Sequence, residues 1–352
     1  MLASAAAAVG LGNIWKFPYV MGENGGGAFV LVYLLCIAFI GLPIMMAEVV
    51  IGRRGRHSPG YAAKSVAQES GKSSAWQLAG WLGMLTGYLV LSFYAVIAGW
   101  GAAYVAKAAQ GVFTGADAEQ IGNTFGQLLS SPLELTAWHT LIIVATILVV
   151  GKGVNKGLER AVRFLLPAMI ALLLGIAVYS GAIGDFWQAF HFMFDPDFSK
   201  LSVNGVMIAL GHSFFTLGLA SGVVIMYGAY LPKETSIVQT SIWIAVLDTF
   251  VALLAGLAIF PLVFGFGLTP SEGPGLIFTT LPIAFSEMTG GALVGTLFFL
   301  MLVIAAFTSA IAMIESSVAF VSEKFNVGRW PATIISGTVL WGLGQLTVHS
   351  FA

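Results

Sequence analysis

The chain has 352 residues, of which 58% are hydrophobic and only 9% are charged, and its mean hydropathy is +0.92. Soluble domains carry about 25% charged residues, so this composition excludes a soluble enzyme or binding module and predicts a polytopic membrane protein. The net charge of −1 carries no information by itself. The single cysteine, Cys36, excludes a disulfide framework and a cysteine-based metal site.

Nine apolar stretches are long enough for membrane helices, and polar or glycine- and proline-rich connections separate them. They lie near residues 2–21, 28–51, 76–109, 136–150, 160–183, 202–231, 237–267, 291–322 and 331–350. The stretch at 136–150 is short and is included because its flanks suit a span. We therefore expect an all-α polytopic membrane protein with about nine spans. It forms one transmembrane domain over residues 1–352, with helices 1–5 at about 2–183 and helices 6–9 at about 202–350.

Basic residues are concentrated in alternate connections, which sets the expected orientation. Lys and Arg gather after the second, fourth, sixth and eighth stretches, at Arg53, Arg54, Arg56, Lys64, Lys72, Lys152, Lys156, Arg160, Arg163, Lys233, Lys324 and Arg329. The other connections contain mainly acidic residues. By the positive-inside rule, the basic connections and the N-terminus are expected in the cytoplasm. Nine spans put Ala352 outside, and residue 1 starts almost within the first stretch, so we expect both ends to be cut.

Two of the nine stretches are interrupted at midlength by helix-weakening residues. In the first, Gly10, Gly12 and Asn13 interrupt the run SAAAAVGLGNIWKFPY. In the sixth, Thr216 and Gly218, with Ser221 and Gly222, interrupt GHSFFTLGLASGVVIMYGAY. Irregular backbone at membrane depth is tolerated where protein buries it or where it lines a cavity. Glycine-interrupted stretches at corresponding places in two halves are the best sequence indication of a transporter's central site, although a glycine kink for helix packing explains either one alone.

The runs AAVGLGNIWKFPY, ENGGGAF, FFTLGLASG, LDTFVALLAGLAIFP and AAFTSAIAMIES resemble the neurotransmitter:sodium symporter family, and most closely its bacterial amino-acid members. The resemblance covers essentially the whole chain. It implies a LeuT-like five-plus-five inverted repeat with broken helices 1 and 6 and without helix 10 onward. It also implies sodium-coupled symport of an amino acid across the cell (inner) membrane, with sodium and the lipid bilayer as partners, no nucleic acid and no cofactor.

The resemblance also implies two sodium sites made of oxygen ligands, which a hard cation prefers. The first would use Ala8, Asn13, Thr216, Asp248 and the carboxylate of the substrate. The second would use the Ala6, Val9 and Ala305 carbonyls with the Thr308 and Ser309 hydroxyls. On residue type alone, these two hydroxyls are more often bonded to carbonyls of their own helix.

The implied substrate pocket lies between helices 1, 3, 6 and 8. The Leu11 and Gly12 amides and the Tyr94 hydroxyl would hold the carboxylate, and the Ala8, Phe215 and Thr216 carbonyls would hold the ammonium group. Tyr94 could instead be an ordinary buried tyrosine. The whole set of implied substrate contacts is Ala8, Leu11, Gly12, Val90, Tyr94, Phe215, Thr216, Gly218, Ser221, Ser309 and Met313.

Several residues depart from the family's pattern. Asp248 replaces a common asparagine, and Ala252 stands where some chloride-independent members have glutamate, so we expect Asp248 to supply the charge and chloride not to be required. Lys16 replaces the usual arginine of the outer gate, without the planar fork of its guanidinium. Its acidic partner is expected in helix 10, and the arginine partner of the cytoplasmic gate acid Glu323 is expected before residue 1.

Three further polar residues lie outside the implied sodium and substrate sites. His212 is expected to be a satisfied polar residue near the outer vestibule, with a proton-sensing role as the alternative. Glu48, close to Arg53, and Glu315 are expected to be structural. Because the stretch 202–231 has glycine and serine at positions 218 and 221, we expect an enlarged pocket for a neutral, aromatic or branched amino acid.

Other functions remain open from the sequence. A transporter of the same fold could carry another organic solute, or the chain could be a truncated, inactive protein. An intramembrane enzyme using Asp248, Glu315 or His212 is disfavoured, because no metalloprotease, paired-aspartate or nucleophile motif accompanies these residues.

Overall fold

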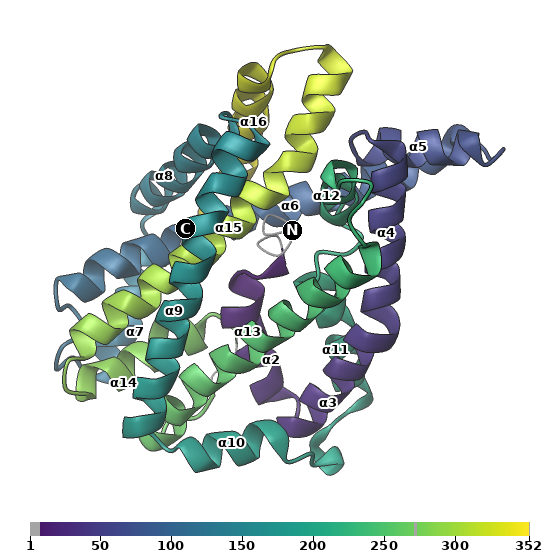
Figure 1. Cartoon of the computed structure of the whole chain (residues 1–352). Coiled ribbons are helices and arrows are strands. Elements are labelled where there is room, and N and C mark those ends of the chain that lie inside the picture. Colours follow the sequence, from purple (N-terminus) through teal and green to yellow (C-terminus); the bar gives the residue numbers. More distant parts are fainter. Residues whose placement is uncertain (1–7, 271–272, 352) are drawn as a thin grey trace.

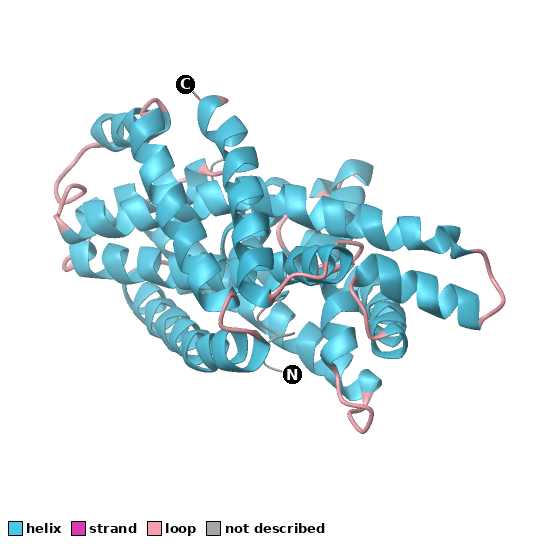
Figure 2. Cartoon of the chain, turned by 90° about the horizontal axis from the view of Figure 1, so that it is seen from above, coloured by secondary structure: helices cyan, strands magenta, loops and turns pink. Residues whose placement is uncertain are grey.

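The computed structural model describes residues 8–270 and 273–351, without the side chain of Asn155. This part of the chain consists of helices and the loops between them, and it contains no strand (Figure 2). The longer helices are α3 (Gly27–Cys36), α4 (Leu42–Gly55), α5 (Pro59–Glu69), α6 (Gln77–Ala109), α7 (Ala118–Leu129), α8 (Pro132–Val150), α9 (Glu159–Ile183), α11 (Val203–Thr216), α13 (Ile237–Gly265), α15 (Gly291–Phe325) and α16 (Arg329–His349). The all-helical prediction is confirmed.

Six of the predicted spans are continuous apolar helices in the described residues. They are Gly27–Gly55, Ser74–Ala109, Pro132–Val150, Lys156–Ile183, Ile237–Gly265 and Gly291–Phe325. The ninth predicted span corresponds to α16, which is less hydrophobic than these six. The remaining two predicted spans are the first and the sixth, and each of them is interrupted.

The first span breaks at the residues that interrupt its sequence. Ala8 is helical, Val9 and Gly10 form a bend, and helical structure resumes at Leu11. It continues through the π-helical turn η1 (Gly12–Lys16) into α2 (Phe17–Glu23). The break therefore leaves the backbone around Gly10 free to bond with other helices.

The sixth span consists of α11, which ends at Thr216, and α12 (Val223–Tyr230). We call the six residues 217–222 between them the helix-6 linker. Gly218 and Gly222 have φ values of +66° and +75°, which glycine adopts without strain. Ala220 has a φ of +56°, a value that is unusual for a residue with a Cβ atom.

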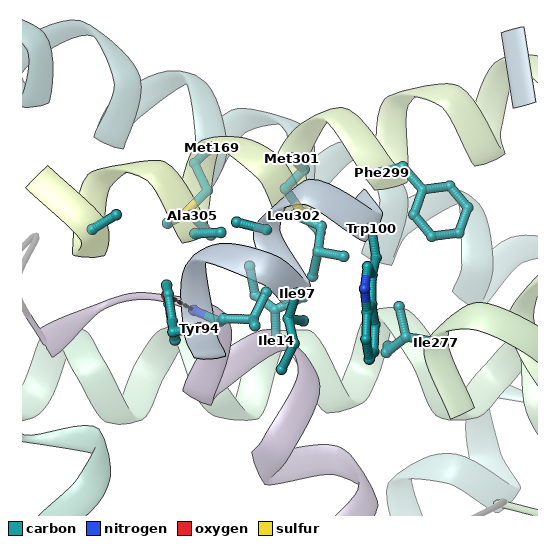
Figure 3. Packing of buried hydrophobic residues seen from close by; sticks show 14 of the residues in the cluster. Ile14, Tyr94, Ile97, Trp100, Met169, Ile277, Phe299, Met301, Leu302 and Ala305 are labelled. Atoms are coloured by element: carbon teal, nitrogen blue, oxygen red, sulfur yellow. Dashed lines mark hydrogen bonds between the residues drawn. The ribbon is translucent and has the colours of Figure 1, made fainter. Parts of the chain in front are cut away.

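The centre of the molecule is formed by α6 and α15, which pack along each other, with α9 against both α13 and α15. Figure 3 shows this core from close by, where Tyr94, Ile97 and Trp100 of α6 face Met301, Leu302 and Ala305 of α15. The first span and α13 lie side by side near the middle of the view in Figure 1. The site residues on these helices are thus held by a packed core.

Helices also occupy connections that the sequence analysis treated as polar loops. These are α5, α7, α10 (Phe186–Phe194) and the pair η6 (Leu276–Thr280) and α14 (Leu281–Glu287). The first turn of α7 contains a capping box, in which Asp117 and Gln120 each accept a hydrogen bond from the backbone N–H of the other. Asp185 similarly caps α10 by accepting from the N–H of Gln188. Both caps are visible in the sequence and were missed because only apolar length was considered.

Close contact between α4 and α12 depends on glycine. A Cβ atom on Gly52 would lie 1.9 Å from the carbonyl oxygen of Ile225, and one on Gly228 would lie 2.6 Å from that of Val49. Backbone atoms cannot move aside as a flexible side chain can, so these glycines set the distance between the two helices.

We expect Gly52→Ala to lower the stability of the protein by about 1–3 kcal/mol, the usual cost of overpacking. The matched control is Gly175→Ala in α9, where an added Cβ meets no atom within 4 Å. That change should raise stability by about 0.5–1 kcal/mol, because alanine is the better helix former. The measurement is the thermal unfolding midpoint in detergent. Equal midpoints for the two variants would contradict the packing argument.

Candidate functional site

Asn13 lies where the first span, α11 and α13 meet, and it is completely buried. Its amide nitrogen donates to Asp248 Oδ1 at 2.7 Å, to the Asp248 carbonyl at 2.9 Å and to Thr216 Oγ1 at 3.3 Å. The Thr216 hydroxyl donates to the Asp248 carboxylate at 3.0 Å. Three of the four residues expected at the first sodium site are thus in direct contact, and their helices come from both halves of the chain.

The other side of the Asn13 amide satisfies the break in the first span. Its Oδ1 accepts a hydrogen bond from the Gly10 N–H at 2.8 Å. The next N–H, that of Leu11, donates to the Tyr94 hydroxyl at 3.0 Å. Two of the groups expected to hold a substrate carboxylate are therefore neighbours, and Tyr94 on α6 reaches the broken backbone.

The residues expected at the second sodium site are partly brought together. The Ser309 hydroxyl donates to the Val9 carbonyl at 3.4 Å, which joins α15 to the first span. The Thr308 hydroxyl donates to Ala305 of its own helix at 2.9 Å. This is the helix back-bonding that the sequence left open for hydroxyls at these positions. Ala6 lies outside the described residues.

A cavity of about 120 Å³ lies between the first span, α6, the helix-6 linker and α15. Ten of the eleven expected substrate contacts line it, and Leu11 is the one that does not. The cavity is also lined by five residues that were not predicted: Gly10, Thr86, Gly87, Leu219 and Val223. No Lys, Arg, His, Asp or Glu is among the described residues that line this cavity.

Two of the unpredicted lining residues, Thr86 and Gly10, could have been identified from the sequence. Thr86 precedes Val90 and Tyr94 by one and two helical turns, so all three share a face of α6. Gly10 belongs to the interrupted run, and a Cβ atom there would lie 2.0 Å from Ser309 Oγ. A larger residue here would have to displace the Ser309 hydroxyl and crowd Tyr94, so glycine suits the close approach of the first span to α15.

The helix-6 linker forms one wall of the cavity. Ser221 donates its hydroxyl to the Gly218 carbonyl, so its side chain is bonded within the linker. A Cβ atom on Gly218 would have Ser221 Oγ, at 3.9 Å, as its only close neighbour. Space is consequently open at position 218.

Aromatic side chains stack beside the cavity, and His212 is among them. The Lys16 ammonium lies 4.1 Å from the centre of the Phe215 ring, a cation–π contact. The His212 ring stacks with that of Phe215 and makes tilted contacts with the rings of Phe17 and Tyr33. Neither nitrogen of its buried ring has a hydrogen-bond partner among the described residues. The expectation of a satisfied polar histidine is therefore wrong, because aromatic rings surround it.

The expected cytoplasmic gate acid, Glu323, contacts the start of α5. Its carboxylate accepts from the Ser58 N–H at 3.1 Å and from the Ser58 hydroxyl at 2.6 Å, and His57 Nδ1 lies 3.5 Å away. In the described part of the chain, its partner is thus a helix N-terminus, which favours negative charge.

Glu315 and Glu48 were both expected to be structural. Glu315 is fully buried and is paired with Arg329, whose Nη1 donates at 2.7 Å, and with the Tyr230 hydroxyl at 2.6 Å. Glu48 forms no ion pair with Arg53, which donates instead to the Thr235 carbonyl at 2.7 Å. Glu48 Oε1 accepts from the N–H of Ala220 in the helix-6 linker, also at 2.7 Å.

Comparison with known proteins identifies relatives along almost the whole chain. The profile of the Sodium:neurotransmitter symporter family matches residues 1–124 and 117–341. The uncharacterized sodium-dependent transporter YhdH of Bacillus subtilis is 38% identical over 344 residues, which cover 98% of this chain and 75% of that protein. An uncharacterized sodium-dependent transporter of Haemophilus influenzae is 33% identical, over 97% of this chain and 76% of its own length.

A solved structure agrees with the fold as well as with the sequence. The crystal structure of MhsT in complex with L-phenylalanine has a TM-score of 0.91 and 42% identity. The match covers all of this chain and 79% of the chain in that structure. It confirms the LeuT-like fold that the two interrupted spans and their motifs predicted.

Proposed function

The chain belongs to the sodium:neurotransmitter symporter family, and we propose that it moves a large neutral amino acid into the cell together with sodium. The observation that supports this most is the convergence of Asn13, Thr216 and Asp248 beside the cavity at the two broken spans. Three oxygen-bearing side chains and backbone groups outside a regular helix suit a hard cation and a zwitterionic substrate better than any catalytic step.

Each polar group of the site would take a defined role. Asn13, Thr216, Asp248 and the Ala8 carbonyl would hold the first sodium ion, with the substrate carboxylate as a further ligand. Because the substrate would complete the ion's coordination, each would raise the affinity of the other by the same factor. The Leu11 N–H and the Tyr94 hydroxyl would turn from each other to the carboxylate. The second sodium ion would lie between the first span and α15.

Residues on the two sides of the cavity would form its extracellular and cytoplasmic gates. Lys16 and Phe215 would close the cavity on the extracellular side, and Glu323 would take part in closing the cytoplasmic side. With the basic connections and the N-terminus in the cytoplasm, this orientation suits uptake across the inner membrane. Rocking of the bundle of helices 1, 2, 6 and 7 against the remaining helices would alternate the access.

The direct test is uptake of radiolabelled amino acids by proteoliposomes that contain the full chain. We expect accumulation of phenylalanine, leucine or tryptophan under an inward sodium gradient and none when potassium replaces sodium. Sodium-independent accumulation, or none for any amino acid, would contradict the proposal.

The charge of Asp248 should make binding independent of chloride. Ala252, one turn further along α13, is buried and provides no second acid. We expect Asp248→Asn to abolish substrate binding in gluconate medium, or to make it depend on added chloride, because the negative charge beside the sodium ion is lost. The control is Asp185→Asn, an exposed acid that can still cap α10 as asparagine. Normal substrate binding by the Asp248→Asn variant in gluconate medium would contradict the proposal that the Asp248 carboxylate compensates the charge of the sodium ion.

The hydroxyls of the second sodium site can be removed together. We expect the double variant Thr308→Ala, Ser309→Ala to weaken sodium binding by about tenfold or more, since each lost oxygen ligand has no replacement in the buried site. Its thermal unfolding midpoint without sodium should change little, because Thr308 bonds only its own helix and the hydrogen bond from Ser309 to the Val9 carbonyl is long, at 3.4 Å. An unchanged sodium affinity would show that the two hydroxyls serve only the packing of α15 and the first span.

Substrate size should depend on Ser221. The cavity has no charged lining residue among those described, and glycine and serine at positions 218 and 221 leave space for a large neutral side chain. We expect tryptophan, tyrosine and leucine to compete for binding better than alanine and glycine. Ser221→Phe should reverse this ranking by filling the space. The proposal of a large substrate fails if alanine or glycine competes best, or if the ranking is unaltered in the variant.

A further inference from the structure

Two hydroxyl groups from different helices converge on Gly10, at the break in the first span. A Cβ atom on Gly10 would lie 2.0 Å from Ser309 Oγ, on α15, and 3.0 Å from Tyr94 Oη, on α6. The side chains of Tyr94 and Ser309 are within hydrogen-bonding range of each other, and both residues are only 4% exposed. Tyr94 is expected at the substrate carboxylate and Ser309 at the second sodium ion, so the two expected sites meet at this pair of hydroxyls.

The two hydroxyls bridge the backbone groups on either side of Gly10. At one end, the Leu11 N–H donates to Tyr94 Oη at 3.0 Å. At the other end, Ser309 donates its only hydroxyl hydrogen to the Val9 carbonyl, over a long distance of 3.4 Å. An amide N–H only donates and a carbonyl only accepts, so the hydrogen bond between the hydroxyls runs from Tyr94 to Ser309. We call this series of Leu11, Tyr94, Ser309 and Val9 the hydroxyl relay.

A cation between the first span and α15 is incompatible with this direction of the relay. The Val9 carbonyl and the Ser309 hydroxyl are both expected ligands of the second sodium ion, and each would turn a lone pair toward it. The hydrogen of a hydroxyl that binds a cation points away from the positive charge, so Ser309 could no longer donate to Val9. A buried hydroxyl without an acceptor is costly, and Tyr94 Oη is the acceptor within range.

The candidate substrate cavity gives the Tyr94 hydrogen a new direction. Tyr94 lines this cavity, where the carboxylate of the substrate is expected, and Figure 3 shows its side chain reaching the first span. An ionised carboxylate only accepts hydrogen bonds and makes strong ones. A Tyr94 hydroxyl that accepts from Ser309 is also the better donor, because hydrogen bonds in series polarise one another. The Leu11 N–H can then turn from Tyr94 to the same carboxylate.

We propose that sodium at the second site reverses the hydroxyl relay and thereby prepares the donors that hold the substrate carboxylate. Without the ion, the hydroxyl hydrogens point from Tyr94 through Ser309 to Val9. With the ion, they point from Ser309 through Tyr94 into the cavity. Tyr94 is thus a positioning residue for an ion that it does not touch, and by linkage the carboxylate raises the affinity for that ion by the same factor. The identities of ion and substrate rest on the proposed function.

The relay can be tested without any substrate. We expect Tyr94→Phe to weaken the binding of one of the two sodium ions by about five- to tenfold, because the Ser309 hydrogen then has no acceptor in the ion-bound state. The measurement is equilibrium binding of radioactive sodium to the full chain in detergent, with no amino acid present. A tyrosine that only contacts the substrate would leave this affinity unchanged, and that result would overturn the proposal.

Two comparisons separate the relay from a general loss of packing. Tyr104→Phe removes the hydroxyl of another buried tyrosine of α6, which donates to the Phe278 carbonyl at 2.9 Å, and it should bind sodium as the unaltered chain does. In a Ser309→Ala background, adding Tyr94→Phe should cause no further loss, because no serine hydrogen is left to accept. An equal loss from Tyr94→Phe in both backgrounds would contradict the relay.

Uptake measurements distinguish failure of the relay from failure of the proposed function. Sodium-driven uptake by the unaltered chain, together with full sodium affinity in Tyr94→Phe, would support the transport function and overturn the relay. Weakened sodium binding in Tyr94→Phe, together with no uptake of any amino acid by the unaltered chain, would contradict the transport function and leave the relay supported. An unaltered chain that binds no sodium would overturn both.

Discussion

The buried amide of Asn13 is the interaction on which the rest of the site depends. A broken helix at membrane depth exposes N–H and carbonyl groups that lipid cannot satisfy. Asn13 bonds the Gly10 N–H with one end of its amide and the Asp248 carboxylate with the other. One side chain thereby compensates for the break and attaches it to α13. Thr216, at the last residue of α11, bonds the same carboxylate, so both interruptions are fixed to one point.

The polar groups of the site are bonded to one another in this structure. Asn13 with Asp248, Leu11 with Tyr94, and Val9 with Ser309 each form a pair of potential ligands. Binding of an ion or a carboxylate would exchange these hydrogen bonds for new contacts of similar kind, so the site would not bury unpaired polar groups in either condition. The free energy of binding is then a small difference between two fully hydrogen-bonded arrangements of the site. This suits a transporter, because it must release what it binds.

The sequence was sufficient for the fold and for most of the cavity lining, for identifiable reasons. Long apolar runs show helices directly, and the glycines of the interrupted runs show where the backbone leaves the helix. Phe215 and Asp248 were found because a family motif surrounds each of them. The partners of Glu48 and His212 could not be found in this way, since they depend on which helices pack together. Glu48 faces a linker 172 residues away, and His212 is surrounded by rings from two other helices.

Ala220 gives the linker an energetic bias of its own. A residue with a Cβ atom costs roughly 1–2 kcal/mol in the left-handed region that Ala220 occupies, whereas glycine occupies it freely. Any conformation of the linker in which residue 220 returns to a negative φ is favoured by that amount, which is a factor of about five or more in population. The identity of this one residue therefore adjusts the balance between linker conformations. Since Ala220 does not line the candidate substrate cavity, a substitution at this position changes the preferred backbone conformation of the linker and leaves the lining of that cavity as it is.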